Sequence, residues 1–81
     1  MQKHGIAFEE ATAVFADEFA RLIPDPDHSD AEDRYLLLGL GSKLRLLIVC
    51  HCYRGSDTIR IISVRKATRP EIRQYESYRH A

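Results

Sequence analysis

The feature that most constrains the fold is residues 58–67, Thr-Ile-Arg-Ile-Ile-Ser-Val-Arg-Lys-Ala, which hold the densest run of β-branched residues in the chain. Because β-branched side chains favour extended backbone, we predict that this segment is the central strand of a sheet. Strict alternation divides its side chains into two sets, Ile59, Ile61, Ser63 and Arg65 on one face and Arg60, Ile62, Val64 and Lys66 on the other. Each predicted face therefore carries aliphatic side chains and at least one cation.

A cation on a covered sheet face must reach an edge, a carboxylate or a ligand, because an unpaired buried charge is costly. Arg60 and Arg65 are therefore candidate ligand-binding residues. The alternative is that both guanidinium groups extend along their aliphatic stems to the rim of the sheet and bind nothing in particular.

Turn signals predict two further strands before this one, at residues 34–40 and 44–53. The segment Gly39-Leu40-Gly41-Ser42 separates these two strands, and Arg54-Gly55-Ser56-Asp57 separates the second from residues 58–67. Such short connections join antiparallel neighbours. We therefore expect a three-stranded antiparallel meander.

The N-terminal part of the chain has apolar residues at helical spacing. Phe8, Ala11, Val14 and Phe15 recur along an alanine-rich segment, which predicts a helix over residues 8–16. Residues 19–23 then suit a fourth strand or a continued helix equally well.

Two capping-box patterns follow. Ser29-Asp-Ala-Glu32 could open one helical turn, and Thr68-Arg69-Pro70-Glu71 predicts a C-terminal helix packed on the sheet. With 81 residues and 44% hydrophobic content, the chain is long enough for one core, so we expect a single α+β domain over residues 1–81.

Several classes of protein can be set aside. The longest nearly apolar run, residues 46–50, is too short to cross a bilayer, so we expect a cytoplasmic protein without membrane contact. Cys50 and Cys52 would share one face of a strand but diverge from bonding geometry, so we expect no mutual disulfide. Cys-His-Cys also lacks the gaps of a zinc knuckle. We expect neither a metal nor another cofactor.

Charge is divided along the chain. Residues 1–33 hold two cations and nine carboxylates, whereas residues 34–81 hold ten cations and three carboxylates. The two halves could simply neutralise each other across the fold. The alternative is an acidic surface around Glu9, Glu10, Asp17 and Glu18, and a basic surface around Arg60, Arg65, Lys66, Arg69 and Arg73 that faces a polyanion.

Cations, histidines and tyrosines on or beside the predicted sheet suit metal-independent cleavage of RNA. In that reaction the ribose 2′-hydroxyl attacks the neighbouring phosphate, so the site needs a base, an acid and fixed positive charge for the phosphorane. Each candidate also has a structural alternative. His51 could be a hydrogen-bonded group within its strand, Lys3 and His4 a frayed terminus, and Arg34 the partner of a nearby aspartate.

At this point the sequence resembles the BrnT family, the toxins of the BrnT–BrnA type II toxin–antitoxin modules. The resemblance runs from residue 3 to about residue 76. It rests on Lys3-His4-Gly5, Phe8-Glu9-Glu10-Ala11, Val14-Phe15, Asp25-Pro26-Asp27-His28-Ser29, Arg34-Tyr35 with Gly39, Ile59-Arg60-Ile61-Ile62-Ser63, Arg65-Lys66-Ala67, Glu71 and Tyr75-Glu76. It implies a RelE-like ribonuclease fold and activity on RNA that arrests translation. It also implies a BrnA-like ribbon-helix-helix antitoxin, which neutralises the toxin and alone contacts operator DNA.

The resemblance places the basic cluster of the family on Lys3, His4, Arg34, Arg65 and Lys66, with Arg69 and Arg73 near it. In our hypothesis Arg65 and Arg34 stabilise the phosphorane, and His4 or His51 transfers protons. The remaining cations hold phosphates on either side: Lys3, Arg60, Lys66, Arg69 and Arg73.

Two functions remain open. Family members usually begin with an extra strand and some helix before Lys-His-Gly, and here only Met1-Gln2 precedes it. We therefore expect that edge strand to be missing. The favoured function is a toxin endoribonuclease, and the alternative is a shortened, non-catalytic relative that binds its antitoxin as a corepressor or assembly subunit.

Overall fold

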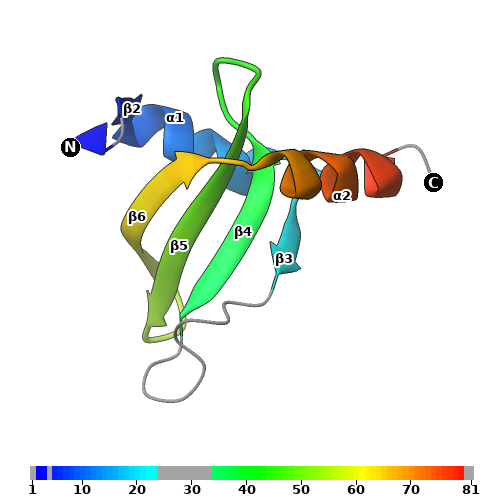
Figure 1. The fold of residues 1–81 in the computed structure, drawn as a ribbon. Helices are drawn as coiled ribbons and strands as arrows, with labels where there is room; N and C mark the ends of the chain where they lie inside the picture. Colours follow the sequence, from blue (N-terminus) through cyan, green and yellow to red (C-terminus); the bar gives the residue numbers. More distant parts are fainter. Residues whose placement is uncertain (1, 4, 24–33, 80–81) are drawn as a thin grey trace.

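A computed structural model describes residues 2–3, 5–23 and 34–79 (Figure 1). Along the chain the elements are β1 (Gln2–Lys3), β2 (Ile6–Ala7), α1 (Phe8–Ala13), the 3-10 turn η1 (Val14–Ala16), β3 (Arg21–Ile23), β4 (Tyr35–Leu40), β5 (Leu46–Arg54), β6 (Thr58–Lys66) and α2 (Arg69–Arg79). The predicted helix over residues 8–16 is thus α1 continued by η1, and residues 19–23 contain a strand. The helical turn expected at residues 29–32 lies outside the described residues.

Four strands form an antiparallel sheet in the order β3-β4-β5-β6, which confirms the α+β class and the meander. The prediction that residues 58–67 form the central strand is wrong. Among the described residues, β6 pairs only with β5 in this sheet, and β4 and β5 are the interior strands. Open solvent beside an edge strand explains how β6 accommodates Arg60 and Lys66, both of which are exposed.

A β-bulge in β6 overturns the strict alternation expected for this strand. Ser63 faces Cys50 on β5, but Ile61 faces the next residue, His51, so Ile62 is the extra residue. The alternation of side chains between the two sheet faces is therefore shifted by one residue at the bulge. Ile59 and Ile61 share a face with Val64 and Lys66, whereas Arg60 shares the opposite face with Ser63 and Arg65.

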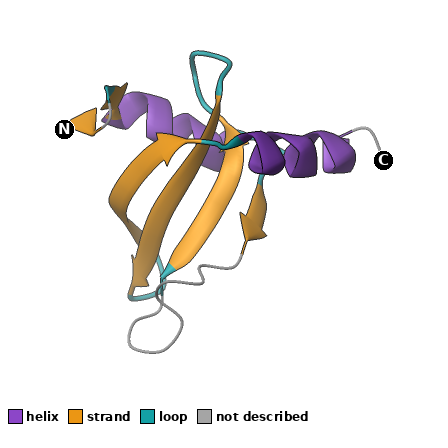
Figure 2. Ribbon diagram, viewed as in Figure 1, coloured by secondary structure: helices purple, strands orange, loops and turns teal. Residues whose placement is uncertain are grey.

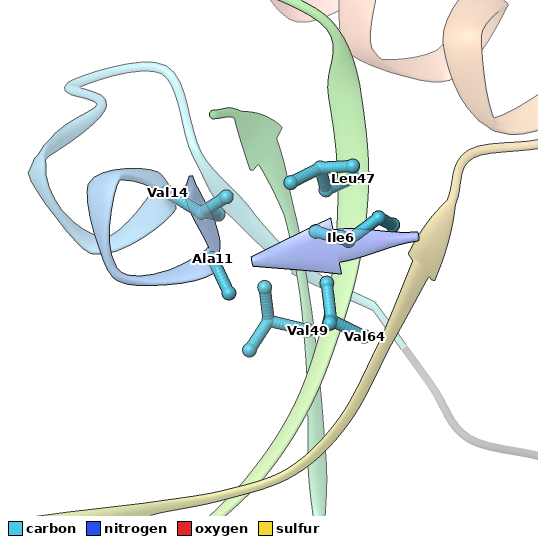
Figure 3. Close-up of a cluster of buried hydrophobic side chains, with 6 residues drawn as sticks. All are labelled: Ile6, Ala11, Val14, Leu47, Val49 and Val64. Atoms are coloured by element: carbon cyan, nitrogen blue, oxygen red, sulfur yellow. The ribbon is translucent and has the colours of Figure 1, made fainter. Parts of the chain in front are cut away.

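The sheet carries a small core on each face, because α1 lies behind it and α2 crosses its front near one end (Figures 1 and 2). On the α1 face, Figure 3 shows the buried cluster of Ile6, Ala11, Val14, Leu47, Val49 and Val64. On the α2 face the buried residues are Leu38, Ile48 and Tyr75. The predicted packing of the last helix on the sheet is therefore confirmed.

Gly39 allows η1 to approach β4 closely. A Cβ atom at this position would lie 2.8 Å from Val14 Cγ1 and 3.0 Å from the Ala20 Cβ. The α1 face is thus filled at this point by chain segments that leave no room for a side chain on β4.

The capping box expected at the start of α2 is present. The Thr68 backbone N–H donates to Glu71 Oε1 at 2.8 Å, and the Glu71 N–H approaches Thr68 Oγ1 at 3.5 Å. No helix of the described residues is long and apolar enough to cross a membrane.

Candidate functional site

Arg65 lies at the junction of β6 and α2, where its guanidinium is held by Glu71. Nη1 donates to Glu71 Oε1 at 2.8 Å and Nη2 donates to Oε2 at 3.0 Å, which is the bidentate geometry of a strong ion pair. Nη1 also approaches the Lys66 carbonyl oxygen at 3.2 Å. The side chain of Arg65 remains 43% exposed, so the guanidinium is fixed in orientation and still reaches solvent.

This ion pair also sets the charge state of Glu71. The hydrogen bonds from Arg65 lower the pKa of Glu71 to about 2, with a further contribution from the Thr68 N–H, although partial burial opposes the shift. Glu71 is therefore a carboxylate at neutral pH and is unsuited to donate a proton there. Its role in the geometry is to orient Arg65.

Further cations surround the junction but are not locked in the same way. Lys66, Arg69 and Arg73 are exposed, the first at the end of β6 and the other two on α2. Because the Arg65–Glu71 pair is neutral as a unit, these side chains supply the net positive charge of the region. Arg60 shares the sheet face of Arg65 but lies toward the opposite end of β6.

His51 lies away from this junction, on the α1 face of the sheet. Its ring is fully buried and contacts Phe15, Tyr35 and Tyr53, with centroid distances of 5.0, 5.9 and 5.4 Å. Nδ1 approaches the Val49 carbonyl oxygen at 3.2 Å, and Nε2 has no hydrogen-bond partner in the part of the chain that the structure describes. Proton exchange with a hydroxyl of RNA would require Tyr35 or Tyr53 to move aside.

The structure therefore does not gather all the predicted site residues at one point. Arg65, Lys66, Arg69 and Arg73 lie around the β6–α2 junction, whereas Arg34 immediately precedes β4 at the other end of the sheet and His51 is buried beneath tyrosines. Lys3 belongs to β1, which lies close to β6 (Figure 1), but its side chain is not described. His4 lies outside the described residues.

Two carboxylates expected on an acidic surface are instead paired within the fold. Glu10 is 1% exposed, and its Oε1 and Oε2 accept from Arg45 Nη2 at 2.8 Å and from Arg45 Nε. The hydrogen bonds from Arg45 outweigh burial and lower the pKa of Glu10. The expected acidic surface is therefore wrong for Glu10, because a chain partner 35 residues away neutralises it inside the fold.

Asp17 is the second of these carboxylates, and it is partly buried. Burial opposes its ionisation, but hydrogen bonds from the Tyr75 hydroxyl and from the Leu40 and Phe19 N–H groups outweigh burial and lower its pKa. Part of the charge division along the sequence is thus internal pairing between the two halves of the chain. Glu9 and Glu18 are exposed, as expected.

An open groove of about 390 Å³ runs between α2 and the β4–β5 hairpin. Its lining combines aliphatic, aromatic and charged side chains: Leu40, Leu44, Arg45, Leu46, Ile72, Tyr75, Glu76 and Arg79. Leu44, at the hairpin tip, is 79% exposed. No group of three or more His, Cys, Asp or Glu side chains in the described part of the chain is arranged to hold a metal ion.

Sequence reasoning missed the groups that position the candidate residues. It assigned Glu71 to a helix cap and did not pair it with Arg65, although the two are only six residues apart across a strand end. The Glu10–Arg45 and Asp17–Tyr75 contacts carried no local signal, because they join segments that only the folded chain brings together.

These features define a small α+β protein with a basic strand–helix junction. A family model described as "Ribonuclease toxin, BrnT, of type II toxin-antitoxin system" matches residues 1–71. The chain therefore belongs to the BrnT family of ribonuclease toxins, as the resemblance indicated, and this membership implies an antitoxin partner. No curated protein matches the sequence.

Proposed function

We propose that the protein is a metal-independent endoribonuclease that cleaves RNA and thereby arrests translation. The observation that carries this proposal is the match of residues 1–71 to the ribonuclease toxin family. The site geometry adds support, because an arginine that is anchored on a carboxylate and still reaches solvent is suited to bind a phosphate in a fixed orientation.

In this proposal Arg65 stabilises the charge that develops on the phosphorane. Its guanidinium has five N–H donors, of which Glu71 takes one from each terminal nitrogen. The cations beside it, Lys66, Arg69 and Arg73, attract and hold the neighbouring phosphates. Their charge is needed because Glu71 neutralises that of Arg65.

Proton transfer is proposed for His4 or His51, with Arg34 as a second cation and Lys3 and Arg60 as phosphate ligands. His51 has an unpartnered Nε2 within the described residues, so it retains the lone pair that a general base requires. Its burial makes movement of the covering tyrosines part of this proposal.

The partner we propose is a BrnA-like ribbon-helix-helix antitoxin, through which alone the toxin would reach operator DNA. For the toxin itself we propose a RelE-like ribonuclease fold, and its antiparallel sheet with one helix on each face is compatible with that fold. We also propose that the protein acts in the cytoplasm, where its RNA substrates are.

The direct test is RNA cleavage by the purified protein in the presence of EDTA. We expect products that end in a 2′,3′-cyclic phosphate and a 5′-hydroxyl, and no cleavage where a 2′-deoxynucleotide replaces the attacking ribose. Arg65→Ala should stay folded by circular dichroism but lose cleavage by about a hundredfold or more. Arg79→Ala is the matched control and should cleave like the wild type.

The outcomes separate the alternatives. Cleavage that requires a divalent metal would contradict the metal-independent mechanism. A folded wild-type protein that binds its antitoxin but neither cleaves RNA nor arrests growth would support the non-catalytic alternative instead.

A further inference from the structure

The bulge in β6 determines which arginines share a face of the sheet. Arg60 and Arg65 are an odd number of residues apart, so in a regular strand they would point to opposite faces. The extra residue, Ile62, shifts the alternation by one. Arg65 is then the register partner of Ile48, which lies in the buried cluster beneath α2, and Arg60 is the partner of Cys52 on the same face. The bulge thus aligns two cations that regular pairing would separate.

Arg54, the last residue of β5, lies on this face as well. It follows Ile48 and Cys52 at even spacing along a strand without a bulge of its own, and its partner on β6 is Thr58. The partners of Arg65 and Arg60 are four residues apart on β5, which is about 13 Å along a strand. A row of three arginines therefore runs along the α2 face, from the β6–α2 junction to the β5–β6 turn.

The two arginines far from the junction keep their charge available. Arg54 and Arg60 are exposed, and neither forms an ion pair with a carboxylate of the described residues. Asp57, in the turn between their strands, accepts from Ser56 Oγ at 2.9 Å. The helix α2 crosses this face at the other end of the sheet (Figure 1), where Glu71 neutralises Arg65. Positive charge that is not neutralised by a described partner thus remains beside the anchored arginine.

The side chains between these arginines are small. Cys52, Thr58 and Ser63 occupy the α2 face of β5 and β6 there. None of the large exposed apolar side chains of the described residues belongs to this face of the two strands. A protein interface is usually anchored by a buried aromatic or aliphatic core, whereas arginines with hydroxyl groups beside them suit phosphates. The composition of this face therefore favours a phosphodiester chain as its ligand.

We propose that single-stranded RNA crosses the α2 face of the sheet from Arg65 toward the β5–β6 turn, and that Arg60 and Arg54 bind the phosphates that flank the one cleaved. This inference rests on the proposed ribonuclease function and adds Arg54 to its substrate contacts. The bulge at Ile62 is the feature that positions Arg60 for this role. Because the contacts are to phosphates, they raise affinity without selecting a base sequence.

The test is binding of a fluorescent 2′-O-methyl oligonucleotide of ten residues, which this mechanism cannot cleave. Each phosphate contact to a single strand contributes about 0.7 to the slope of log Kd against log salt, so losing one weakens binding roughly fivefold near 0.1 M salt. We expect this loss from Arg54→Gln and from Arg60→Gln, with purine and pyrimidine strands alike. Arg79→Gln, at the C-terminal end of α2, is the matched control and should bind like the wild type.

Moving the cation between the two faces tests the effect of the bulge. Arg60→Gln combined with Thr58→Arg returns a cation to the α2 face at an exposed position, and should bind within about twofold of the wild type. Arg60→Gln combined with Ile59→Arg places the cation on the α1 face, at a residue that is 43% exposed, and should bind as weakly as Arg60→Gln alone. Both double variants keep the net charge of the wild type. Equal recovery in the two would overturn the proposal, because charge and not the face would then decide binding.

Unchanged RNA binding by Arg54→Gln and Arg60→Gln would overturn it as well. A fall in Tm without a loss of RNA binding would show instead that these arginines pair with the chain itself, since residues 24–33 contain five carboxylates. Loss of antitoxin binding alone would show a protein interface. Failure of the ribonuclease proposal looks different: the wild type would cleave no RNA, yet binding through Arg54 and Arg60 would persist. In an active enzyme, Arg54→Gln should raise KM for a ten-residue RNA and leave kcat within about twofold.

Discussion

Tyr75 donates its phenolic hydrogen to Asp17 Oδ2 at 2.6 Å, and this contact ties α2 to the segment that leaves η1. The same oxygen accepts from the Leu40 N–H at 2.9 Å, and Oδ1 accepts from the Phe19 N–H at 3.0 Å. Three parts of the chain thus meet at one carboxylate. Burial, and then the hydrogen bond to Asp17, raises the pKa of Tyr75 to about 12, so the hydroxyl remains a donor at any pH at which the protein is used.

Replacing Tyr75 by Phe should destabilise the fold modestly. Asp17 keeps its two backbone donors, so only one charge-assisted hydrogen bond is lost, which typically costs about 1.5–3 kcal/mol. For a domain of this size, that is a fall in Tm of roughly 6 °C or more by thermal unfolding. Tyr78→Phe is the matched control and should leave Tm unchanged, because the contact of Tyr78 with Arg21 uses the ring face.

Stability should fall in acid as Glu71 is protonated. The pKa of Glu71 is about 2 in the folded protein and 4.5 in the absence of such contacts. Its contribution to the free energy of unfolding is therefore complete above pH 4.5 and is lost as the pH falls toward 2. The lowered pKa values of Glu10 and Asp17 act in the same direction. Between pH 7 and pH 3, thermal unfolding should show that Glu71→Gln has a smaller drop in Tm than the wild type. Glu76→Gln, at an exposed position on α2, should keep the wild-type profile.

The Glu10–Arg45 pair should respond to mutation non-additively. Arg45→Met leaves the buried carboxylate of Glu10 without its bidentate partner, although Lys43 and Lys66 still offset part of its charge. Tm should therefore drop sharply at pH 7 and recover partly in acid, since protonation removes the unpaired charge. The double variant Glu10→Gln with Arg45→Met should be more stable at pH 7 than Arg45→Met alone. Equal Tm values for the two variants would contradict a buried, charged Glu10.

The sequence sufficed for elements whose signals are local. The capping box at Thr68 and the glycine-containing turns predicted α2 and the meander, because they act through neighbouring residues. Strand ends shifted by one or two residues, as with residues 44–53 against the observed Leu46–Arg54. Such shifts are expected where the last residues of a strand lack a partner to pair with.

The order of the strands and the faces of β6 could not be predicted in this way. A β-branched composition indicates a strand but does not say whether it has one neighbour or two, so β6 was assigned to the centre. The bulge at Ile62 inverts the parity of the strand without any sequence signal, because it follows from pairing with β5. For the candidate site, the residue types were predictable, but the pairing of Arg65 with Glu71 and the burial of His51 depend on packing across the fold.

Gly39 should not tolerate a methyl group. Gly39→Ala brings Cβ within 2.8 Å of Val14 Cγ1 in the buried cluster on the α1 face, so η1 or β4 must shift. Overpacking of this kind typically costs about 1–3 kcal/mol in the free energy of unfolding. Gly55→Ala is an informative comparison, because a Cβ there meets open space and its cost comes only from the positive φ of 69°. Urea unfolding of the two variants separates steric clash from backbone strain, and a fully stable Gly39→Ala protein would contradict the close approach of η1.

Geometry rather than charge alone should decide the role of Arg65. Lysine at this position keeps the positive charge but presents a point charge instead of a planar fork, so it cannot repeat the two parallel bonds to Glu71 and still orient donors toward a phosphate. We therefore expect Arg65→Lys to lose RNA cleavage by at least about tenfold, while circular dichroism shows a folded protein. Arg79→Lys controls for the substitution itself and should cleave normally. Glu71→Gln provides the complementary measurement: it retains Arg65 but loosens its anchor, so kcat should fall while RNA binding at low salt is kept or strengthened by the lost negative charge. An Arg65→Lys protein with wild-type cleavage would show that only the charge matters, and the anchoring by Glu71 would then serve the stability of the β6–α2 junction alone.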